Sequence, residues 1–110
     1  KKGRPYIVTG SPGSSRIIST ILQTVTNVID FDMNIQEAVN APKVHNEWFP
    51  DELRLEKGIS PDTVRILKGM GHKVVTGDPM GCSTSILVDP KTGTRYGAPD
   101  PRREGSARGE

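Results

Sequence analysis

The stretch Pro5-Tyr6-Ile7-Val8-Thr9-Gly10, followed by Ser11-Pro12-Gly13-Ser14-Ser15, decides how this chain folds. Its β-branched and aromatic residues predict a short strand, and the small residues and proline behind them predict a turn. Apolar residues then recur every three or four positions, at Ile17, Ile18, Ile21, Leu22, Val25, Val28 and Ile29. This spacing is typical of a helix with one apolar face. We therefore expect a strand, a small-residue loop and a long helix in direct succession.

Signals for a second, shorter helix lie between Asn34 and Pro42. Asn34 is a favoured N-cap residue, and Glu37 follows three positions later, which is the capping-box arrangement. Pro42 cannot continue a helix, so the helix is expected to end before it. Residues 43–50 have an irregular pattern, and we expect no strand or helix there.

The second half of the chain predicts one more helix and several short strands. Ser60-Pro61-Asp62 is a helix start with Ser60 as the cap, and Gly71 ends that helix. The expected strands cover residues 53–56, 73–76, 84–88 and 94–96, and a hairpin connection covers 89–93. From Ala98 onward Pro, Arg and Gly dominate, so we expect regular structure to end there.

The order of these elements predicts an α+β fold in which helices pack on one face of a mostly antiparallel sheet. A length of 110 residues allows one domain at most. Hydrophobic residues make up only 33% of the chain, so we expect a thin core and sheet edges that need further strands. The alternative of a self-standing small binding module fits these features poorly.

The composition argues against several classes of function. The 15 basic and 13 acidic residues are spread along the chain, so no nucleic-acid partner is expected. No apolar run is long enough to predict a membrane-spanning segment. Cys82 is the one cysteine, and His45 and His72 have no Asp or Glu at metal-ligand spacing. We therefore expect no internal disulfide, no metal and no cofactor.

Chemistry is most expected in the loop over residues 10–15. Backbone N–H groups and the helix dipole at the start of a helix favour negative charge. Small side chains let a substrate approach the backbone, so the loop suits an oxyanion hole or a carboxylate site; a plain turn with an N-cap is the other interpretation. No Lys stands where a phosphate-binding P-loop requires one. The adjacent acids Asp51 and Glu52 are expected to be surface charges, and Cys82 a spectator thiol.

Several stretches of the chain carry a family resemblance. They are Thr9-Gly10-Ser11-Pro12-Gly13, Ser15-Arg16-Ile17-Ile18, 34–42, 48–54, Glu56-Lys57-Gly58, 60–63, Met80-Gly81, Tyr96-Gly97-Ala98 and Asp100-Pro101-Arg102. Together they resemble the C-terminal part of the small subunit of a bacterial gamma-glutamyltransferase, also called gamma-glutamyltranspeptidase. On this resemblance, residues 1–102 are the small-subunit portion and residues 103–110 are a flexible tail.

The resemblance implies part of an αββα N-terminal nucleophile hydrolase sandwich, made by autocleavage of a precursor into a large and a small subunit. A threonine freed at the start of the small subunit would attack the gamma-glutamyl amide of glutathione and pass the glutamyl group to an amino acid, a peptide or water. The implied partners are glutathione or other gamma-glutamyl compounds, the acceptor, and the rest of both subunits. The implied location is the periplasm or cell exterior. Lys1 lies downstream of where that threonine would stand, so we expect no catalytic residue in this segment and no turnover by the segment alone.

The same resemblance assigns an oxyanion-hole and substrate-binding role to Gly13 and Ser14. In the family, two consecutive glycines donate backbone N–H groups to the oxyanion, and Ser14 replaces the second of them. The N–H group survives this replacement, but a positive φ at Ser14 would cost energy that glycine avoids. Loss of one oxyanion donor costs on the order of 3 kcal/mol in the transition state. The alternative function is therefore a catalytically degenerate homologue that acts as a ligand-binding or structural partner subunit.

Overall fold

The computed structural model describes residues 2–109, and its elements follow the predicted order with one addition. The elements are β1 (Ile7–Gly10), α1 (Arg16–Ile29), α2 (Ile35–Asn40), β2 (Val44–Glu47), β3 (Glu52–Glu56), α3 (Pro61–Gly69), β4 (Val74–Gly77), β5 (Thr84–Val88) and β6 (Arg95–Ala98). The opening strand, loop and long helix are therefore confirmed. The mixture of helices and strands confirms the α+β class.

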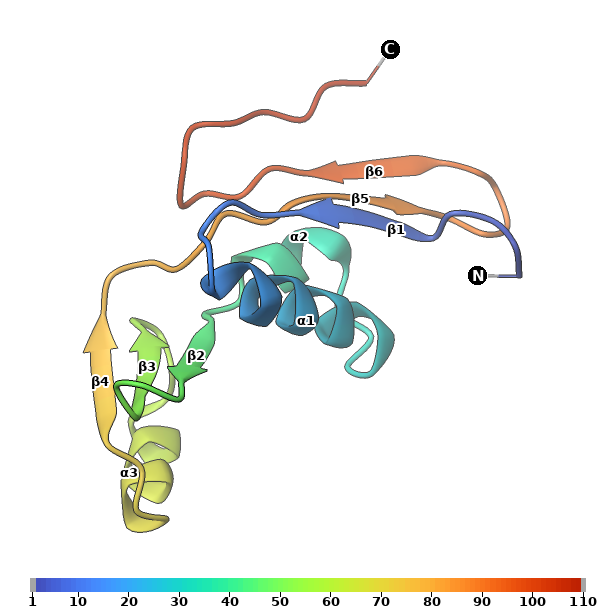
Figure 1. Ribbon diagram of the computed structural model, residues 1–110. Helices are drawn as coiled ribbons and strands as arrows, with labels where there is room; N and C mark the ends of the chain where they lie inside the picture. The colour runs from blue at the N-terminus through green and yellow to red at the C-terminus, as the bar shows by residue number, and fades with distance from the viewer. Residues whose placement is uncertain (1, 110) are drawn as a thin grey trace.

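The strands divide between two small sheets rather than forming one. The first sheet has the order β1-β5-β6 and is antiparallel throughout, and the second has the order β2-β3-β4. In the second sheet β2 and β3 are antiparallel, but β3 and β4 are parallel because α3 forms the crossover between them. Helices α1 and α2 lie against one face of the first sheet, and α3 lies at the far end of the second (Figure 1).

The strand β2 corrects the expectation that residues 43–50 are irregular. Its residues Val44-His45-Asn46-Glu47 include only one β-branched side chain, so the local sequence gives a weak strand signal. Pairing with β3 supplies the missing preference, with His45 opposite Arg54 in the register. The strand β2 therefore forms because β3 pairs with it in the folded chain, and the local sequence alone does not predict it.

The helix ends match the predicted signals unequally. Asn34 accepts a hydrogen bond from the Glu37 amide at 2.9 Å, and the Glu37 carboxylate accepts one from the Asn34 amide at 3.1 Å. The predicted capping box of α2 is therefore confirmed. Ser60 does precede α3, but its side chain makes no capping hydrogen bond, so Pro61 and the backbone alone begin that helix.

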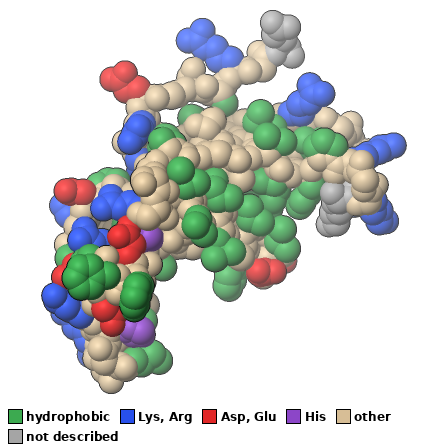
Figure 2. All heavy atoms as spheres, viewed as in Figure 1, with side chains coloured by type: hydrophobic (Ala, Val, Ile, Leu, Met, Phe, Trp, Pro, Cys, Tyr) green, Lys and Arg blue, Asp and Glu red, His purple; other side chains and the backbone are tan. Residues whose placement is uncertain are grey.

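The hydrophobic core is small and lies between α1, α2 and the first sheet. Its buried members are Val28, Ile35, Ala38, Val39 and Ala98, with Tyr6, Ile7, Met33 and Leu87 packed around them. Other large apolar side chains are exposed, and on α1 and just beyond it these are Ile17, Ile18, Leu22, Ile29 and Phe31. Figure 2 shows hydrophobic side chains gathered over the outward side of this helix. The thin core expected from the composition is thus what the fold contains.

Candidate functional site

The loop between β1 and α1 has an unusual backbone at Gly13 and Ser14. Gly13 has a φ of 131° and Ser14 a φ of 53°, and both values are positive. The turn is closed by two backbone hydrogen bonds, from the Arg16 amide to the Gly13 carbonyl at 3.1 Å and from the Ile17 amide to the Ser14 carbonyl at 3.0 Å. A left-handed conformation costs a residue with a Cβ atom roughly 1–2 kcal/mol. Ser14 therefore adopts a geometry that glycine would adopt more easily.

The position of this loop suits the binding of an anion. It lies at the N-terminus of a 14-residue helix, where the first N–H groups have no intrahelical acceptor and carry partial positive charge. The first turn of α1 contains no acidic side chain of its own, although the carboxylate of Glu47 on β2 accepts a hydrogen bond from Ser15 beside it. Both predicted site residues, Gly13 and Ser14, are exposed at this end of the helix. The geometry can therefore present backbone donors to a negatively charged group.

A second loop, residues 78–83 between β4 and β5, packs against the first one at Gly81. A Cβ atom on Gly81 would lie 2.5 Å from the Thr20 Oγ1 atom and 3.0 Å from the Ser11 Oγ atom, so only glycine fits there. The backbone amide of Cys82 donates to Ser11 Oγ at 3.0 Å, and Ser11 in turn donates to the Pro12 carbonyl at 2.8 Å. The second loop thus holds the entry to the Gly13–Ser14 turn.

Small hydroxyl side chains fill the space behind these loops. Thr9 Oγ1 lies 2.7 Å from Ser85 Oγ and 3.2 Å from Ser83 Oγ, and Thr24 donates to Ser83 Oγ at 3.1 Å. Ser83, Ser85 and Thr24 are buried. These contacts join β1, β5 and α1, so hydrogen bonds hold the strand and the helix together next to the candidate site, in addition to the apolar core further along them.

A buried ionic network supports the second loop from below. Glu56 accepts hydrogen bonds from the backbone amide of Met80 and, at 2.8 Å, from that of Lys43; Asp100 accepts one from Ser83 at 2.6 Å. Arg102 donates to both carboxylates, to Glu56 at 2.6 Å and to Asp100 at 3.1 Å. Burial raises the pKa of Glu56, but the hydrogen bonds from Arg102 and the two amides outweigh it, so the pKa lies below its ordinary value. The sequence pattern did not reveal this network.

Lys43 completes the network at the C-terminus of α2. Its ammonium donates to the carbonyls of Ala38, Val39 and Ala41 at 2.8, 3.2 and 2.8 Å. These carbonyls lie at the negative end of the helix, where a cation is favoured. Burial, together with the nearby positive charge of Arg102, lowers the pKa of Lys43 to about 8.

On its other side, the Gly13–Ser14 turn is linked to β2. Ser15 donates a hydrogen bond to Glu47 Oε1, and His45 Nε2 lies 2.9 Å from the same oxygen. The other ring nitrogen of His45 lies 2.8 Å from Ser19 Oγ. The hydrogen bonds from Ser15 and His45 hold the pKa of Glu47 below its ordinary value. His45 is thus a buried, hydrogen-bonded ring.

The remaining residues considered from the sequence lie away from this turn. His72 is exposed at the end of α3, and Asp51 is an exposed charge, but Glu52 is half-buried and pairs with Lys73 at 2.8 Å. Within residues 2–109 no group of three or more His, Cys, Asp and Glu could hold a metal ion. No helix of the described part of the chain is long and apolar enough to cross a membrane.

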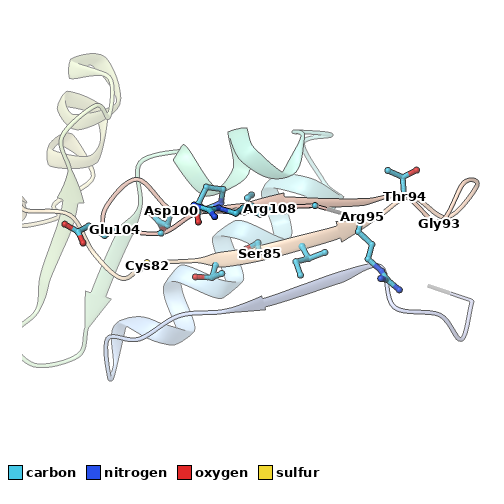
Figure 3. A pocket seen from close by; sticks show the side chains of 17 residues that line it. Cys82, Ser85, Gly93, Thr94, Arg95, Asp100, Glu104 and Arg108 are labelled. Carbon is cyan, nitrogen blue, oxygen red and sulfur yellow. The ribbon is translucent and has the colours of Figure 1, made fainter.

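A cavity of about 940 Å³ lies elsewhere, between the first sheet and the chain segment over residues 104–109. Ser85, Gly97 and Cys82 contribute to one wall and Ala107 to the other, and Figure 3 shows the side chains around it. The segment returns along the sheet on the side away from α1 and α2 (Figure 1). Neither Gly13 nor Ser14 lines this cavity. The loop and the cavity are therefore separate features of the molecule.

Several known proteins are similar to this chain in sequence. The sequence profile of the family described as Gamma-glutamyltranspeptidase matches residues 1–110. A glutathione hydrolase proenzyme of Escherichia coli (strain K12) is 55% identical over 102 residues, which cover 93% of this chain and 17% of that protein. The chain thus spans about a fifth of the length of the curated relatives it matches.

Solved structures share its fold as well. An acivicin-inhibited gamma-glutamyltranspeptidase is 50% identical with a TM-score of 0.90, and the match covers 96% of this chain and 57% of that one. The gamma-glutamyltranspeptidase of Pseudomonas nitroreducens, in complex with L-DON, is 32% identical with a TM-score of 0.89, covering 100% and 58% of the two chains. The arrangement described above is therefore that of a known enzyme fold.

Proposed function

The chain belongs to the gamma-glutamyltranspeptidase family, a family of enzymes, and we propose that it forms the C-terminal part of the small subunit of a glutathione hydrolase or gamma-glutamyltransferase. In this proposal residues 1–102 are the small-subunit portion and residues 103–110 are the tail that follows it; residues 1 and 110 lie outside the described residues. The proposal is supported by the family match over residues 1–110 and by the likeness to solved gamma-glutamyltranspeptidases.

The proposed reaction is acyl transfer. A threonine at the start of the small subunit, outside this chain, attacks the gamma-glutamyl amide of glutathione or another gamma-glutamyl compound. The carbonyl oxygen becomes negatively charged as the tetrahedral intermediate forms. The glutamyl group then passes to an amino acid, a peptide or water. The contribution of this chain is to stabilise the oxyanion through the backbone N–H groups of Gly13 and Ser14.

One observation carries the assignment of the oxyanion role. Ser14 keeps a φ of 53° although it has a Cβ atom, and Gly13 before it has a φ of 131°. Residues in such conformations cluster at functional sites and persist where the surrounding structure holds them. Here Ser11 is held by the Cys82 amide, and Ser15 by Glu47. Ser14 thus adopts a positive φ that glycine would adopt easily, and this favours an active enzyme over a degenerate homologue.

The rest of the proposed enzyme would cover surfaces that this chain exposes. In an αββα sandwich a second sheet packs on the face of the first sheet opposite the helices, where the paired residues Val8 and Ile86 are exposed. The remaining small-subunit residues and the large subunit are the proposed partners. The periplasm or cell exterior is the proposed location. In the acivicin-inhibited relative the C-terminus has critical roles in autoprocessing and catalysis. We assign a comparable supporting role to Arg102, which ties the C-terminal segment to the loop over residues 78–83 through Glu56.

Replacing Gly13 by alanine in the full-length protein tests the oxyanion role. A Cβ atom is strained at a φ of 131°, so the turn must shift and misplace its donors. The kcat for gamma-glutamyl-p-nitroanilide is expected to fall by roughly 10²–10³, the usual effect of losing an oxyanion donor. Gly58→Ala is the matched control, because Gly58 also has a positive φ of 105° but contacts Pro42 rather than the loop. Equal losses of kcat in both variants would contradict the assignment.

A further inference from the structure

Ser15 does not use its hydroxyl in the way that its place at the N-terminus of α1 suggests. It is the N-cap residue, yet its φ of −55° and ψ of −29° are helical and its side chain makes no capping hydrogen bond. A serine at this position usually accepts a hydrogen bond from an amide of the first turn. Here the hydroxyl donates to Glu47 Oε1 instead, which lies 32 positions later at the end of β2. The side chain therefore links two elements rather than ending one.

Two further hydrogen-bonded links continue this connection along the same face of α1. Ser19 Oγ lies 2.8 Å from His45 Nδ1, and the Gln23 amide group donates to the Val44 carbonyl at 2.7 Å and accepts from the Val44 amide at 2.8 Å. Ser15, Ser19 and Gln23 are spaced four residues apart, so they lie one above the other on the helix. We name these three side chains and their β2 partners the α1–β2 ladder.

Glu47 and His45 act together within the ladder. A carboxylate oxygen only accepts, so His45 Nε2 is the donor to Glu47 at 2.9 Å, while His45 Nδ1 lies 2.8 Å from the Ser19 hydroxyl oxygen. His45 is buried, with 5% of its side chain exposed, so its ring is held in place. The ring thereby orients the carboxylate of Glu47 toward Ser15. Arg16 is the further charged group whose field acts on Glu47.

The Ser15 link bears directly on the proposed oxyanion loop, because Ser15 follows Ser14. The entry to the turn is held by the contact of Ser11 with the Cys82 amide, and the exit by the contact of Ser15 with Glu47. The unfavourable φ of Ser14 requires such restraints on both sides. We propose that Glu47, oriented by His45, is a positioning residue that holds the Gly13–Ser14 turn in place through Ser15. This inference rests on the function proposed above for that turn.

The contact is poorly explained by stability alone. Glu47 has 42% of its side chain exposed, and contacts between exposed polar groups add little to the stability of a protein. Loss of the contact should therefore change the melting temperature little. What it removes is a restraint on the backbone of the turn, which is visible in local exchange and in kcat.

The test compares Glu47→Ala, Glu47→Gln, Ser15→Ala and the Glu47→Ala/Ser15→Ala double variant in the full-length protein. Two quantities are measured. The first is hydrogen–deuterium exchange of peptides covering residues 11–18, which include the Arg16 and Ile17 amides that close the turn. The second is the kcat and KM for gamma-glutamyl-p-nitroanilide. Glu52→Ala is the matched control, because Glu52 is the cross-strand neighbour of Glu47 in β3 and pairs with Lys73, so the variant removes a nearby acid without removing the contact with Ser15.

Glu47→Ala and Ser15→Ala are each expected to speed exchange in this peptide and to lower kcat about tenfold, the effect of losing one charge-assisted hydrogen bond. KM should stay close to its original value in both variants, and so should the melting temperature of Ser15→Ala. The melting temperature of Glu47→Ala should fall modestly, because this variant also leaves the buried Nε2 of His45 without its acceptor. The double variant should lose no more kcat than Glu47→Ala alone, because the contact that Ser15→Ala removes is already absent there. Glu47→Gln should recover most of the kcat, since its amide oxygen still accepts from Ser15. Glu52→Ala should change neither quantity.

Unchanged exchange in Glu47→Ala, or additive losses in the double variant, would overturn the inference. The exchange measurement does not depend on turnover. If the natural protein releases no p-nitroaniline, the proposed function fails, while faster exchange in Glu47→Ala would still support the role of Glu47. If the natural protein is active and exchange does not respond, only the role of Glu47 fails.

Discussion

Arg102 and Glu56 lie 46 residues apart in the sequence and form a buried ion pair, with Nη2 2.6 Å from Oε2. Arg102 also donates to the carbonyls of Val39 and Ala41 at 2.8 and 2.9 Å. One guanidinium therefore connects the C-terminal segment to β3 and to the end of α2. Because Glu56 also accepts from Met80, the pair restrains the loop that packs on Ser11.

Replacing Arg102 by methionine should destabilise the protein strongly. The variant leaves the carboxylate of Glu56 buried without its charged partner, and breaking a buried ion pair on one side typically costs about 3–5 kcal/mol. Denaturant unfolding of the full-length protein measures this loss. Arg65→Met is the control, because the Arg65–Asp62 pair is exposed and should contribute less than about 1 kcal/mol. If the two variants lose the same free energy of unfolding, the buried ion pair contributes no more stability than the exposed one.

The buried ammonium of Lys43 predicts a particular dependence of stability on pH. Its pKa is lowered from 10.5 to about 8 in the folded protein, so between these values the unfolded chain binds more protons than the folded chain. The free energy of unfolding contributed by this group should therefore rise from about pH 8 toward pH 10 and be constant below pH 8. Unfolding titrations of the natural protein and Lys43→Met at several pH values isolate the effect by difference. A difference that falls across this range would contradict the prediction.

Ser14→Gly should make the protein slightly more stable. The φ of 53° costs serine roughly 1–2 kcal/mol, and the greater freedom of glycine in the unfolded chain offsets about half of that. A gain of roughly 0.5 kcal/mol in the free energy of unfolding is therefore expected. Ser60→Gly is the control, because Ser60 has a φ of −53° and gains nothing from glycine. If Ser14→Gly lowers the melting temperature as much as Ser60→Gly does, the backbone of the turn differs from the one described.

Gly81→Ala should destabilise the contact between the two loops. The new Cβ atom would lie 2.5 Å from Thr20 Oγ1 in a residue with a φ of 71°. Overpacking and backbone strain together should cost more than about 2 kcal/mol. Gly71→Ala is the control, because Gly71 has a φ of 94° with no atom within 4 Å of the new Cβ, so only strain remains. Thermal unfolding should rank Gly81→Ala well below Gly71→Ala, and the reverse order would refute the packing described.

The features that the sequence predicted correctly depend on neighbours along the chain. The capping box needs only Asn34 and Glu37, and the loop before α1 is marked by its own small residues. The strand β2 was missed because its strand character comes from pairing with β3. No local pattern marks Lys43 for burial, because a charged residue is normally exposed unless distant partners satisfy it.

The candidate site divides in the same way. Family resemblance and local chemistry selected Gly13 and Ser14, and their oxyanion role stays a prediction. The sequence could say only that a positive φ at Ser14 would cost energy. The structure shows that the φ is positive, with a value of 53°. The roles of Glu47 and His45 could not be predicted, because their partners Ser15 and Ser19 lie at the start of α1. Along the chain, α2 separates this helix from β2.

Release of p-nitroaniline from gamma-glutamyl-p-nitroanilide by the full-length protein tests the central claim most directly. We expect the natural protein to release p-nitroaniline after autocleavage, and Ser14→Gly to do so at the same or a higher rate. If only the Ser14→Gly variant releases p-nitroaniline, the result would contradict the claim that the loop tolerates Ser14. If neither protein releases p-nitroaniline although autocleavage is complete, the result would contradict the enzyme assignment. It would favour a homologue that only binds a ligand or a partner subunit.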